Sequence, residues 1–302
     1  MSFFAKAQRT LIIIFLGLHA SFSYGYLKDE VGLISNIAYG KAERQVLDVY
    51  YPTAKTENAP VIFMVHGGAW RTGDKASRAV IKNKVAHWVP KGFIFISVNY
   101  RLLPKTDPLE QAEDVTKALG FAQKRAREWG GSPDKFILMG HSAGAHLISL
   151  VSVNQDASIK PWLGTIALDT SAYDVVSVMR GKRPSNLYKR AFGRNPEYWK
   201  NASPLHQLSD ALPPFLAVCS STRKDDSCAT AKRFIEKAEA FGSKTKLLPI
   251  PFSHRKINAA LGQDACYTGE VNAFIQQLHP STKSLLTTQT TSDHETTKNC
   301  AR

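Results

Sequence analysis

Residues 136–150 read FILMGHSAGAHLISL and join an apolar run to a pattern of helical spacing. The junction, residues 140–144, matches the motif G-x-S-x-G, in which Ser142 lies between small residues. A strand followed at once by a helix is the context in which this motif forms a strained turn that exposes the serine hydroxyl. The alternative is a structural turn that only needs small residues. We expect Ser142 to be a nucleophile.

Apolar runs alternate with amphipathic stretches along most of the chain. Runs such as VIFMV and FIFISV read as buried strands, and residues 108–130 between two such runs carry apolar side chains at helical spacing. This alternation predicts an α/β fold, with a mainly parallel sheet covered by helices on both faces. The first two strand-like segments, VGLISNIAYG and RQVLDVYYP, are joined without a helix, which predicts an antiparallel edge.

The alternation breaks at about residues 172–212, which have no strand-like run and are rich in aromatic and basic side chains. A long insertion between a strand and the next unit is typical of a cap or a binding loop. No repeat or linker marks a second domain, so we expect one domain over residues 27–280. Residues 281–302 are rich in Thr and Ser, which predicts a disordered tail.

The N-terminal segment, residues 1–26, has the composition of a signal peptide. Lys6 and Arg9 precede an apolar core at residues 11–18, and small residues follow. The core is too short to span a bilayer comfortably, so cleavage is favoured over an uncleaved anchor. We expect an exported protein, periplasmic or secreted, with no stable membrane insertion after processing.

Export permits disulfide bonds, and four cysteines follow the signal segment. Cys219 and Cys228 are close in sequence around a loop, and we favour that pair. Cys266 and Cys300 could form a second bond that ties down the tail. Four cysteines allow three pairings, so the connectivity stays open.

The 302-residue chain has a formal net charge of +14. Its basic residues are scattered, and they form no stripe on a recognisable nucleic-acid-binding module. We therefore interpret the charge as a solvated basic surface and expect no nucleic-acid partner.

A serine needs a base, and the base needs an orienting group. His254 follows the apolar run TKLLPIP in the loop FSHRKIN, where a base after the last strands is expected. The other histidines after Ser142 are less suitable. His146 is expected to pack or hydrogen-bond locally on the helix after the turn, and the rest are in the insertion or near the end of the chain: His206, His279 and His294.

The segment HGGAW, residues 66–70, ends the run VIFMV. Glycines there let backbone N–H groups face a cavity, where they can stabilise the negative oxygen that forms in acyl transfer. The candidate donors are Gly67, Gly68, Ala69 and Ala143. The alternative is a glycine turn with a packed Trp70.

The segments HGGAW, VNYRL, GHSAGAHL, FGRNPEYWKNASPLHQL, PPFLAVCSS and FSHRKIN together resemble the α/β-hydrolases. The similarity covers residues 32–278 and is greatest to the esterase branch with an HGGxW motif, which contains feruloyl-esterase-like, hormone-sensitive-lipase-like and kynurenine-formamidase-like proteins. It implies an α/β-hydrolase fold with a mostly parallel, eight-stranded sheet and a small cap. It also implies hydrolysis through an acyl-serine intermediate, with no metal and no other cofactor.

The acid is where this chain departs from that family. The family carries it a few residues after the strand here written PPFLAVCSS, and that register falls on Arg223. We favour Asp226, with Asp225 as the alternate, in the loop that the expected disulfide would close. Asp169, at the end of GTIALD, is the third choice, because some α/β-hydrolases place the acid after the preceding strand. Its other possible role is an ion pair with Arg223.

These features predict a serine carboxylesterase that acts on small or medium carboxylic esters, including acetylated or feruloylated sugars. The partner expected is thus a small-molecule ester. An arylformamidase is an alternative, although that activity is usually intracellular and the signal segment argues against it. A lipase acting at membrane surfaces and a non-catalytic binding protein of the same fold are further alternatives. The sequence gives no oligomeric state.

Overall fold

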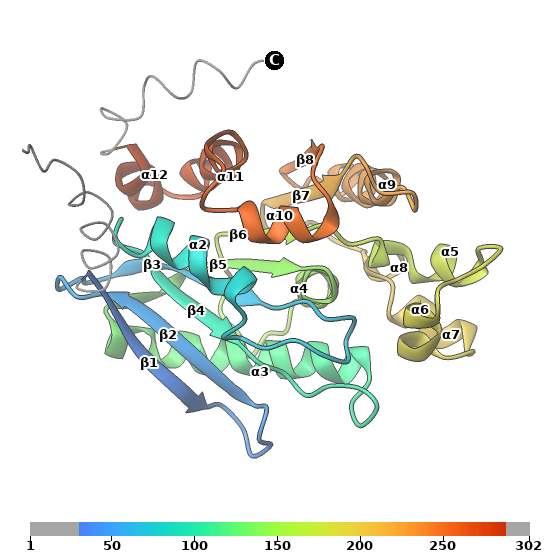
Figure 1. Ribbon diagram of the computed structural model, residues 1–302, viewed down its shortest axis with the longest axis horizontal. Helices are drawn as coiled ribbons and strands as arrows, with labels where there is room; N and C mark the ends of the chain where they lie inside the picture. The colour runs from blue at the N-terminus through green and yellow to red at the C-terminus, as the bar shows by residue number, and fades with distance from the viewer. Residues whose placement is uncertain (1–29, 288–302) are drawn as a thin grey trace, which may run out of the picture.

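A computed structural model describes residues 30–287 of the chain (Figure 1). The predicted signal peptide, residues 1–26, and most of the predicted tail lie outside these residues. Over the described range, no helix combines the length and the apolar character that a membrane span requires.

An eight-stranded sheet forms the centre of the described residues, in the order β1-β2-β4-β3-β5-β6-β7-β8. The strands are β1 (Val31–Ala38), β2 (Val46–Pro52), β3 (Ala59–Val65), β4 (Ile94–Val98), β5 (Gly131–His141), β6 (Gly164–Leu168), β7 (Phe215–Ser220) and β8 (Thr245–Ile250). Strands β1 and β2 pair antiparallel, as do β2 and β4, whereas β4, β3, β5, β6, β7 and β8 run parallel. The predicted eight-stranded, mostly parallel sheet and its antiparallel edge are confirmed.

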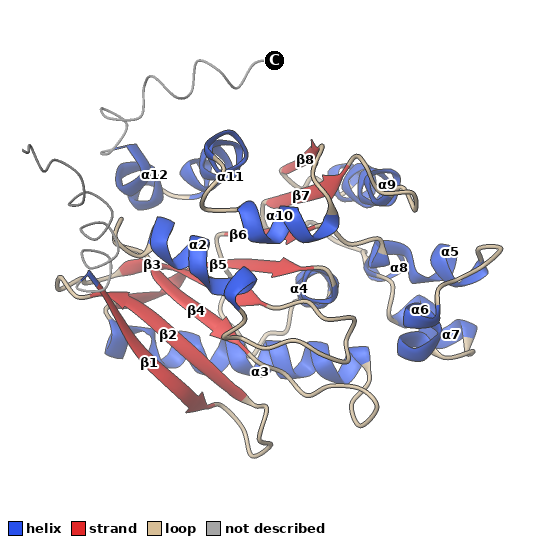
Figure 2. Ribbon diagram, viewed as in Figure 1, coloured by secondary structure: helices blue, strands red, loops and turns tan. Residues whose placement is uncertain are grey.

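Helices cover both faces of the sheet (Figure 2). Outside the insertion they are α2 (Arg78–Trp88), α3 (Pro108–Arg125), η1 (Ala126–Trp129), α4 (Ala143–Val153), α9 (Ser227–Ala240), α10 (His254–Ala260), α11 (Ala265–Leu278) and α12 (Pro280–Thr287). Side chains alternate along β3, so Phe63 packs in the apolar cluster under α3 and α4, and Met64 packs in the cluster under α2 and α11. A strand buried on both faces explains the continuous apolar run in the sequence.

The predicted cap insertion lies between β6 and β7 and consists of short helices. These are η2 (Ala172–Asp174), α5 (Val175–Arg180), α6 (Asn186–Phe192), α7 (Pro196–Asn201) and α8 (Pro204–Gln207). In Figure 1, α5, α6 and α7 lie together at one side of the molecule, far from β1. Phe192 is buried there against Trp70, with 4.9 Å between ring centroids, so aromatic packing attaches the cap to the body of the domain.

The prediction that the disordered tail starts at residue 281 is wrong for its first residues. Residues 280–287 form α12, in which Thr282 and Leu286 are buried. The Thr282 hydroxyl donates a hydrogen bond to the carbonyl oxygen of Ile275 on α11, at 2.7 Å. Within the Thr/Ser-rich stretch, a pair of leucines supplies enough apolar surface to dock one more helix. The folded domain therefore extends to at least residue 287.

The predicted Cys219–Cys228 disulfide is confirmed. It joins the carboxyl-end half of β7 to the first turn of α9, across the loop that contains Arg223. The suggested bond from Cys266 to Cys300 stays a prediction, because Cys300 lies outside the described residues.

Replacing both Cys219 and Cys228 with Ala is expected to lower the free energy of unfolding by about 2–3 kcal/mol. The reason is that a cross-link between residues nine apart restricts the unfolded chain. Urea unfolding of both proteins without reductant measures the difference. Equal urea midpoints would show that the cross-link contributes no stability.

Candidate active site

The turn that presents Ser142 connects β5 to α4 at the carboxyl end of the sheet. Ser142 has φ 57° and ψ −117°, a strained conformation for a residue with a side chain. A Cβ atom on Gly144 would lie 2.2 Å from the carbonyl oxygen of Val65, and one on Gly140 would lie 2.5 Å from that of Gly144. The small residues of the motif are therefore required because the turn is pressed against the end of β3.

Ser142, His254 and Asp169 form a continuous hydrogen-bonded line. The hydroxyl oxygen of Ser142 lies 2.9 Å from Nε2 of His254, and Nδ1 of His254 lies 2.6 Å from Oδ2 of Asp169. The three residues follow β5, β8 and β6. The carboxyl ends of these parallel strands meet at one edge of the sheet, which is how residues 85 and 112 positions apart come together.

Asp169 is fully buried and remains charged. Burial by itself would raise the pKa of Asp169, but the hydrogen bond from His254, the charge of Arg223 and two further donors hold it well below its usual range. Those donors are the backbone N–H of Ser220, at 3.0 Å, and the hydroxyl of Ser227, at 2.7 Å, both to Oδ1. A charged Asp169 accepts the Nδ1 proton of His254, which leaves the Nε2 lone pair directed at Ser142.

Arg223 occupies the position where the related family carries its acid. Its Nη1 atom lies 3.0 Å from Oδ2 of Asp169 and 3.1 Å from Nδ1 of His254. Because the Nδ1 proton already points to Asp169, the guanidinium and the imidazole share the carboxylate and do not bond each other. Arg223 also donates from Nε to Asp225, at 2.8 Å. Asp169 thus forms an ion pair with Arg223 and a hydrogen bond with His254 at the same time.

The favoured acid, Asp226, does not reach His254, which corrects the expectation from the sequence. Its Oδ1 accepts a hydrogen bond from the backbone N–H of Ala229, at 3.1 Å, and so caps the first turn of α9. Asp225 is held by Arg223 and by the hydroxyl of Ser171, at 2.9 Å. The sequence signal for Asp169 was its place at the end of β6, the strand that pairs with β5.

Of the four expected oxyanion donors, Ala69 and Ala143 line the same hollow as Ser142 and His254. Ala143 is the first residue of α4, so its N–H has no partner within the helix. Gly67 and Gly68 form the tight turn before Ala69, and a Cβ atom on Gly67 would lie 3.0 Å from that of Ser142. The glycines therefore allow the end of β3 and the Ser142 turn to approach each other, and Ala69, the next residue, lines the hollow.

Trp70 fixes the segment that follows β3. Ala69 and Trp70 both have positive φ, 56° and 60°. The carbonyl oxygen of Trp70 accepts hydrogen bonds from the backbone N–H of Leu103 and from Nε2 of Gln111, each at 2.9 Å. These two donors stabilise a left-handed backbone that costs free energy in residues other than glycine.

His146 connects this segment to the cap. The indole N–H of Trp70 donates to Nδ1 of His146 at 3.1 Å, and Nε2 of His146 donates to the carbonyl oxygen of Ala202 at 2.7 Å. Burial lowers the pKa of His146 to about 4, so the ring is neutral with its proton on Nε2. The sequence indicated only local contacts for this residue, because its partners are 76 and 56 positions away.

His141, inside the G-x-S-x-G motif, was not singled out from the sequence. Its Nε2 donates a hydrogen bond to the backbone carbonyl of His254 at 3.0 Å, and the two rings are 4.6 Å apart. Burial, together with the nearby His254, lowers the pKa of His141 to about 3. A neutral His141 therefore anchors the start of α10, where His254 begins the helix.

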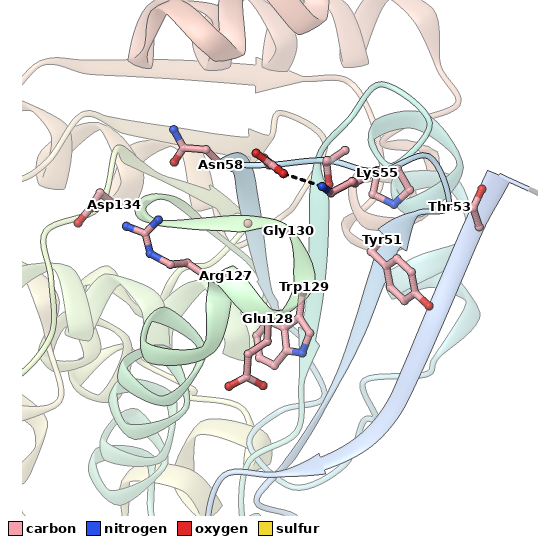
Figure 3. Close-up of a pocket in the computed structure, with 13 residues that line it drawn as sticks. Tyr51, Thr53, Lys55, Asn58, Arg127, Glu128, Trp129, Gly130 and Asp134 are labelled. Atoms are coloured by element: carbon pink, nitrogen blue, oxygen red, sulfur yellow. Dashed lines mark ion pairs between the residues drawn. The ribbon is translucent and has the colours of Figure 1, made fainter.

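The hollow at Ser142 has a volume of about 590 Å³ and lies between the sheet and the cap. Tyr188 and Leu187 of α6 contribute apolar side chains to it. A larger hollow of about 970 Å³ lies at the other end of the sheet, where β3 and β5 begin, and Figure 3 shows the residues that line it. It contains none of the hydrogen-bonded residues around Ser142, so cavity size alone does not locate the chemistry.

Comparisons with known proteins agree with this geometry. The family model described as BD-FAE matches residues 47–232. A probable isoprenylcysteine alpha-carbonyl methylesterase of Arabidopsis thaliana is 25% identical, over 70% of this chain and 48% of that protein. The probable carboxylic ester hydrolase LipM of Mycobacterium tuberculosis is 26% identical, over 82% of this chain and 61% of that protein. The chain therefore spans about half to three-fifths of the length of these curated relatives.

Among solved structures, esterase B from Lactobacillus rhamnosis superposes with a TM-score of 0.67 at 19% sequence identity. The superposition covers 91% of this chain and 97% of that one. At 19% identity, this likeness shows a shared fold.

Acidification is expected to destabilise the protein between about pH 6.5 and pH 4. Burial lowers the pKa of His66 and His146 to about 4 and that of His141 to about 3, whereas the same rings titrate near 6.5 in the unfolded chain. In this interval the unfolded chain binds more protons, so the stability present above pH 6.5 is lost as the pH falls.

The variant His146→Gln removes one of these groups and keeps a side chain that can donate and accept. Between pH 6 and 5, its free energy of unfolding should depend less steeply on pH, by about 1.4 kcal/mol per pH unit. Urea unfolding at several pH values measures the slopes. The same slope in variant and wild type would contradict a neutral, buried His146.

Proposed function

The chain belongs to the BD-FAE family, an α/β-hydrolase esterase family, and we propose that it is a serine carboxylesterase acting on small or medium carboxylic esters. The α/β-hydrolase fold predicted from the sequence is confirmed. The observation that carries the proposal is the line from Ser142 through His254 to Asp169, with distances of 2.9 Å and 2.6 Å. The names of the relatives, a carboxylic ester hydrolase and a methylesterase, support an ester substrate.

In the proposed acylation step, Oγ of Ser142 attacks the carbonyl carbon of the ester. Nε2 of His254 takes the hydroxyl proton as the new O–C bond forms. When the tetrahedral intermediate collapses, the bond to the alcohol oxygen breaks, and His254 returns the proton to that oxygen. The alcohol leaves, and the acyl group remains on Ser142.

Deacylation repeats these transfers with water as the nucleophile. His254 takes one proton from water while the oxygen attacks the acyl carbon. The bond to Oγ of Ser142 then breaks, the serine recovers its proton from His254, and the carboxylic acid leaves. The two steps balance without a redox change, and the side chains of this site supply every proton transfer.

Asp169 and the backbone donors stabilise the charges that develop. The buried carboxylate of Asp169 orients His254 and stabilises its cation. We assign the oxyanion to the N–H groups of Ala69 and Ala143, because both residues line the hollow with Ser142. One such donor is typically worth about 10² to 10³ in rate. Arg223 holds Asp169 in place through Oδ2, the oxygen that accepts from His254.

Export of the enzyme is part of the proposal. The signal-like segment at residues 1–26 predicts it, and the Cys219–Cys228 disulfide is consistent with folding in an oxidising compartment. An exported esterase would act on esters supplied from outside the cell.

Ser142→Ala should abolish hydrolysis of short 4-nitrophenyl esters, because it removes the hydroxyl on which the acyl intermediate forms in the proposed mechanism. The wild-type protein should also be labelled by a fluorophosphonate probe, and the variant should not. Retained hydrolysis together with retained labelling would show that another residue is the nucleophile. Labelling of neither protein would point to a binding protein of the same fold.

Asp169→Asn should lower kcat by about 10² to 10⁴-fold, because His254 loses the charge that orients it and stabilises its cation. Asp226→Asn is the matched control, since it makes the same chemical change at a carboxylate that only caps α9. Its kcat should change by less than about threefold. A larger loss in Asp226→Asn than in Asp169→Asn would return the role of the acid to Asp226.

A further inference from the structure

The loop between α5 and α6 carries two basic side chains over the catalytic hollow. Lys182 and Arg183 both line the hollow that contains Ser142, and both are exposed. Within residues 30–287 neither forms an ion pair, whereas Lys200 on the same cap pairs with Glu197. Their charges are therefore available to a molecule that enters the hollow.

The carboxylates of the hollow do not neutralise these two residues. Asp169 and Asp225 are the acidic residues that line it, and both are bound to Arg223. Asp169 is also buried under His254 and two further donors. The single charge of Arg223 against these two carboxylates leaves the floor of the hollow at a formal −1. Lys182 and Arg183 bring the residues that line the hollow to +1, so the positive charge that is not taken up by an ion pair lies on the loop at its rim.

The rest of the cap also carries a net positive charge. Residues 175–201 contain seven basic residues and one acidic residue, Glu197. The basic residues are Arg180, Lys182, Arg183, Lys189, Arg190, Arg194 and Lys200. A concave site beside charges of one sign concentrates ligands of the opposite sign.

We propose that the natural ester carries a carboxylate on its acyl or its alcohol part, separated from the cleaved bond by a carbon skeleton, and that Lys182 and Arg183 bind this carboxylate. The inference rests on the proposed esterase function and specifies its substrate class. A guanidinium offers two parallel N–H donors to a carboxylate, and an ammonium adds a mobile point charge. An apolar contact from Tyr188 or Leu187 would hold the carbon skeleton between the ester and the charged group.

Two pairs of synthetic esters test this, each differing in one charge. On the acyl side, mono-4-nitrophenyl adipate is compared with 4-nitrophenyl hexanoate, which has the same leaving group and chain length. On the alcohol side, 4-acetoxybenzoate is compared with 4-acetoxybenzamide. The quantity measured is kcat/KM for the charged ester divided by kcat/KM for its neutral partner. A preference for the charged ester in either pair identifies the side that carries the carboxylate.

The variant Lys182→Gln/Arg183→Gln should lower this ratio by about tenfold, because each exposed ion pair contributes up to a few-fold. Lys189→Gln/Arg190→Gln is the matched control. It removes the same charge from the same cap, at residues that line a neighbouring hollow without Ser142. Its ratio should change by less than about twofold. Lys182→Arg/Arg183→Lys, which keeps both charges, should retain most of the preference.

Salt dependence of the wild-type protein gives a test that needs no variant. The preference should largely disappear in 1 M salt, where the screening length is about 3 Å, compared with about 10 Å at 0.1 M. No charge preference in either pair, or equal losses in the two glutamine variants, would overturn the inference and leave the esterase function standing. Failure to hydrolyse any of the four esters would overturn both.

Discussion

The close approach of the Ser142 turn to the end of β3 is the constraint on which the site depends. Gly144 touches the carbonyl of Val65 so closely that a single added Cβ atom would lie 2.2 Å from it. At this contact Ser142 adopts its strained backbone, and the segment after β3 lies beside the Ser142 turn. One close contact therefore places both the proposed nucleophile and the segment whose backbone N–H groups are proposed to bind the oxyanion. The glycines on both sides of the contact permit it.

The charged side chains that contact His254, Asp169 and Arg223, lie at the same edge of the sheet as Ser142. A buried carboxylate is costly unless it is paired and hydrogen-bonded. Asp169 meets this requirement with His254 and Arg223, and with the backbone N–H of Ser220 and the hydroxyl of Ser227. The arginine at the usual acid position is thus compatible with a complete line of contacts. The carboxylate comes from the neighbouring strand, and the arginine compensates its charge.

The cap is joined to this centre through a neutral histidine. His146 accepts from Trp70 and donates to Ala202, so the segment after β3, the helix after Ser142 and the cap share one buried chain of hydrogen bonds. Truncating the ring would leave two buried polar groups without partners, which costs more than the hydrogen bonds contribute. Aromatic packing of Phe192 on Trp70 adds an apolar contact at the same junction. The cap is therefore an integral part of the domain.

The sequence by itself determined the sheet and the place of Ser142 and His254, and it favoured the disulfide between Cys219 and Cys228 among three possible pairings. Each of these features can be predicted from a short stretch of sequence: an apolar run, a glycine-rich turn, or two cysteines at a short spacing. Only the tertiary structure decided that Asp169 contacts His254, since the carboxyl ends of β6 and β8, on the two sides of β7, bring together residues that are 85 positions apart. It also decided that residues 280–287 fold and that Lys182 and Arg183 face the hollow. Long-range contacts of this kind leave no periodic pattern in a single sequence, whereas burial and strand order fix them once the chain is folded.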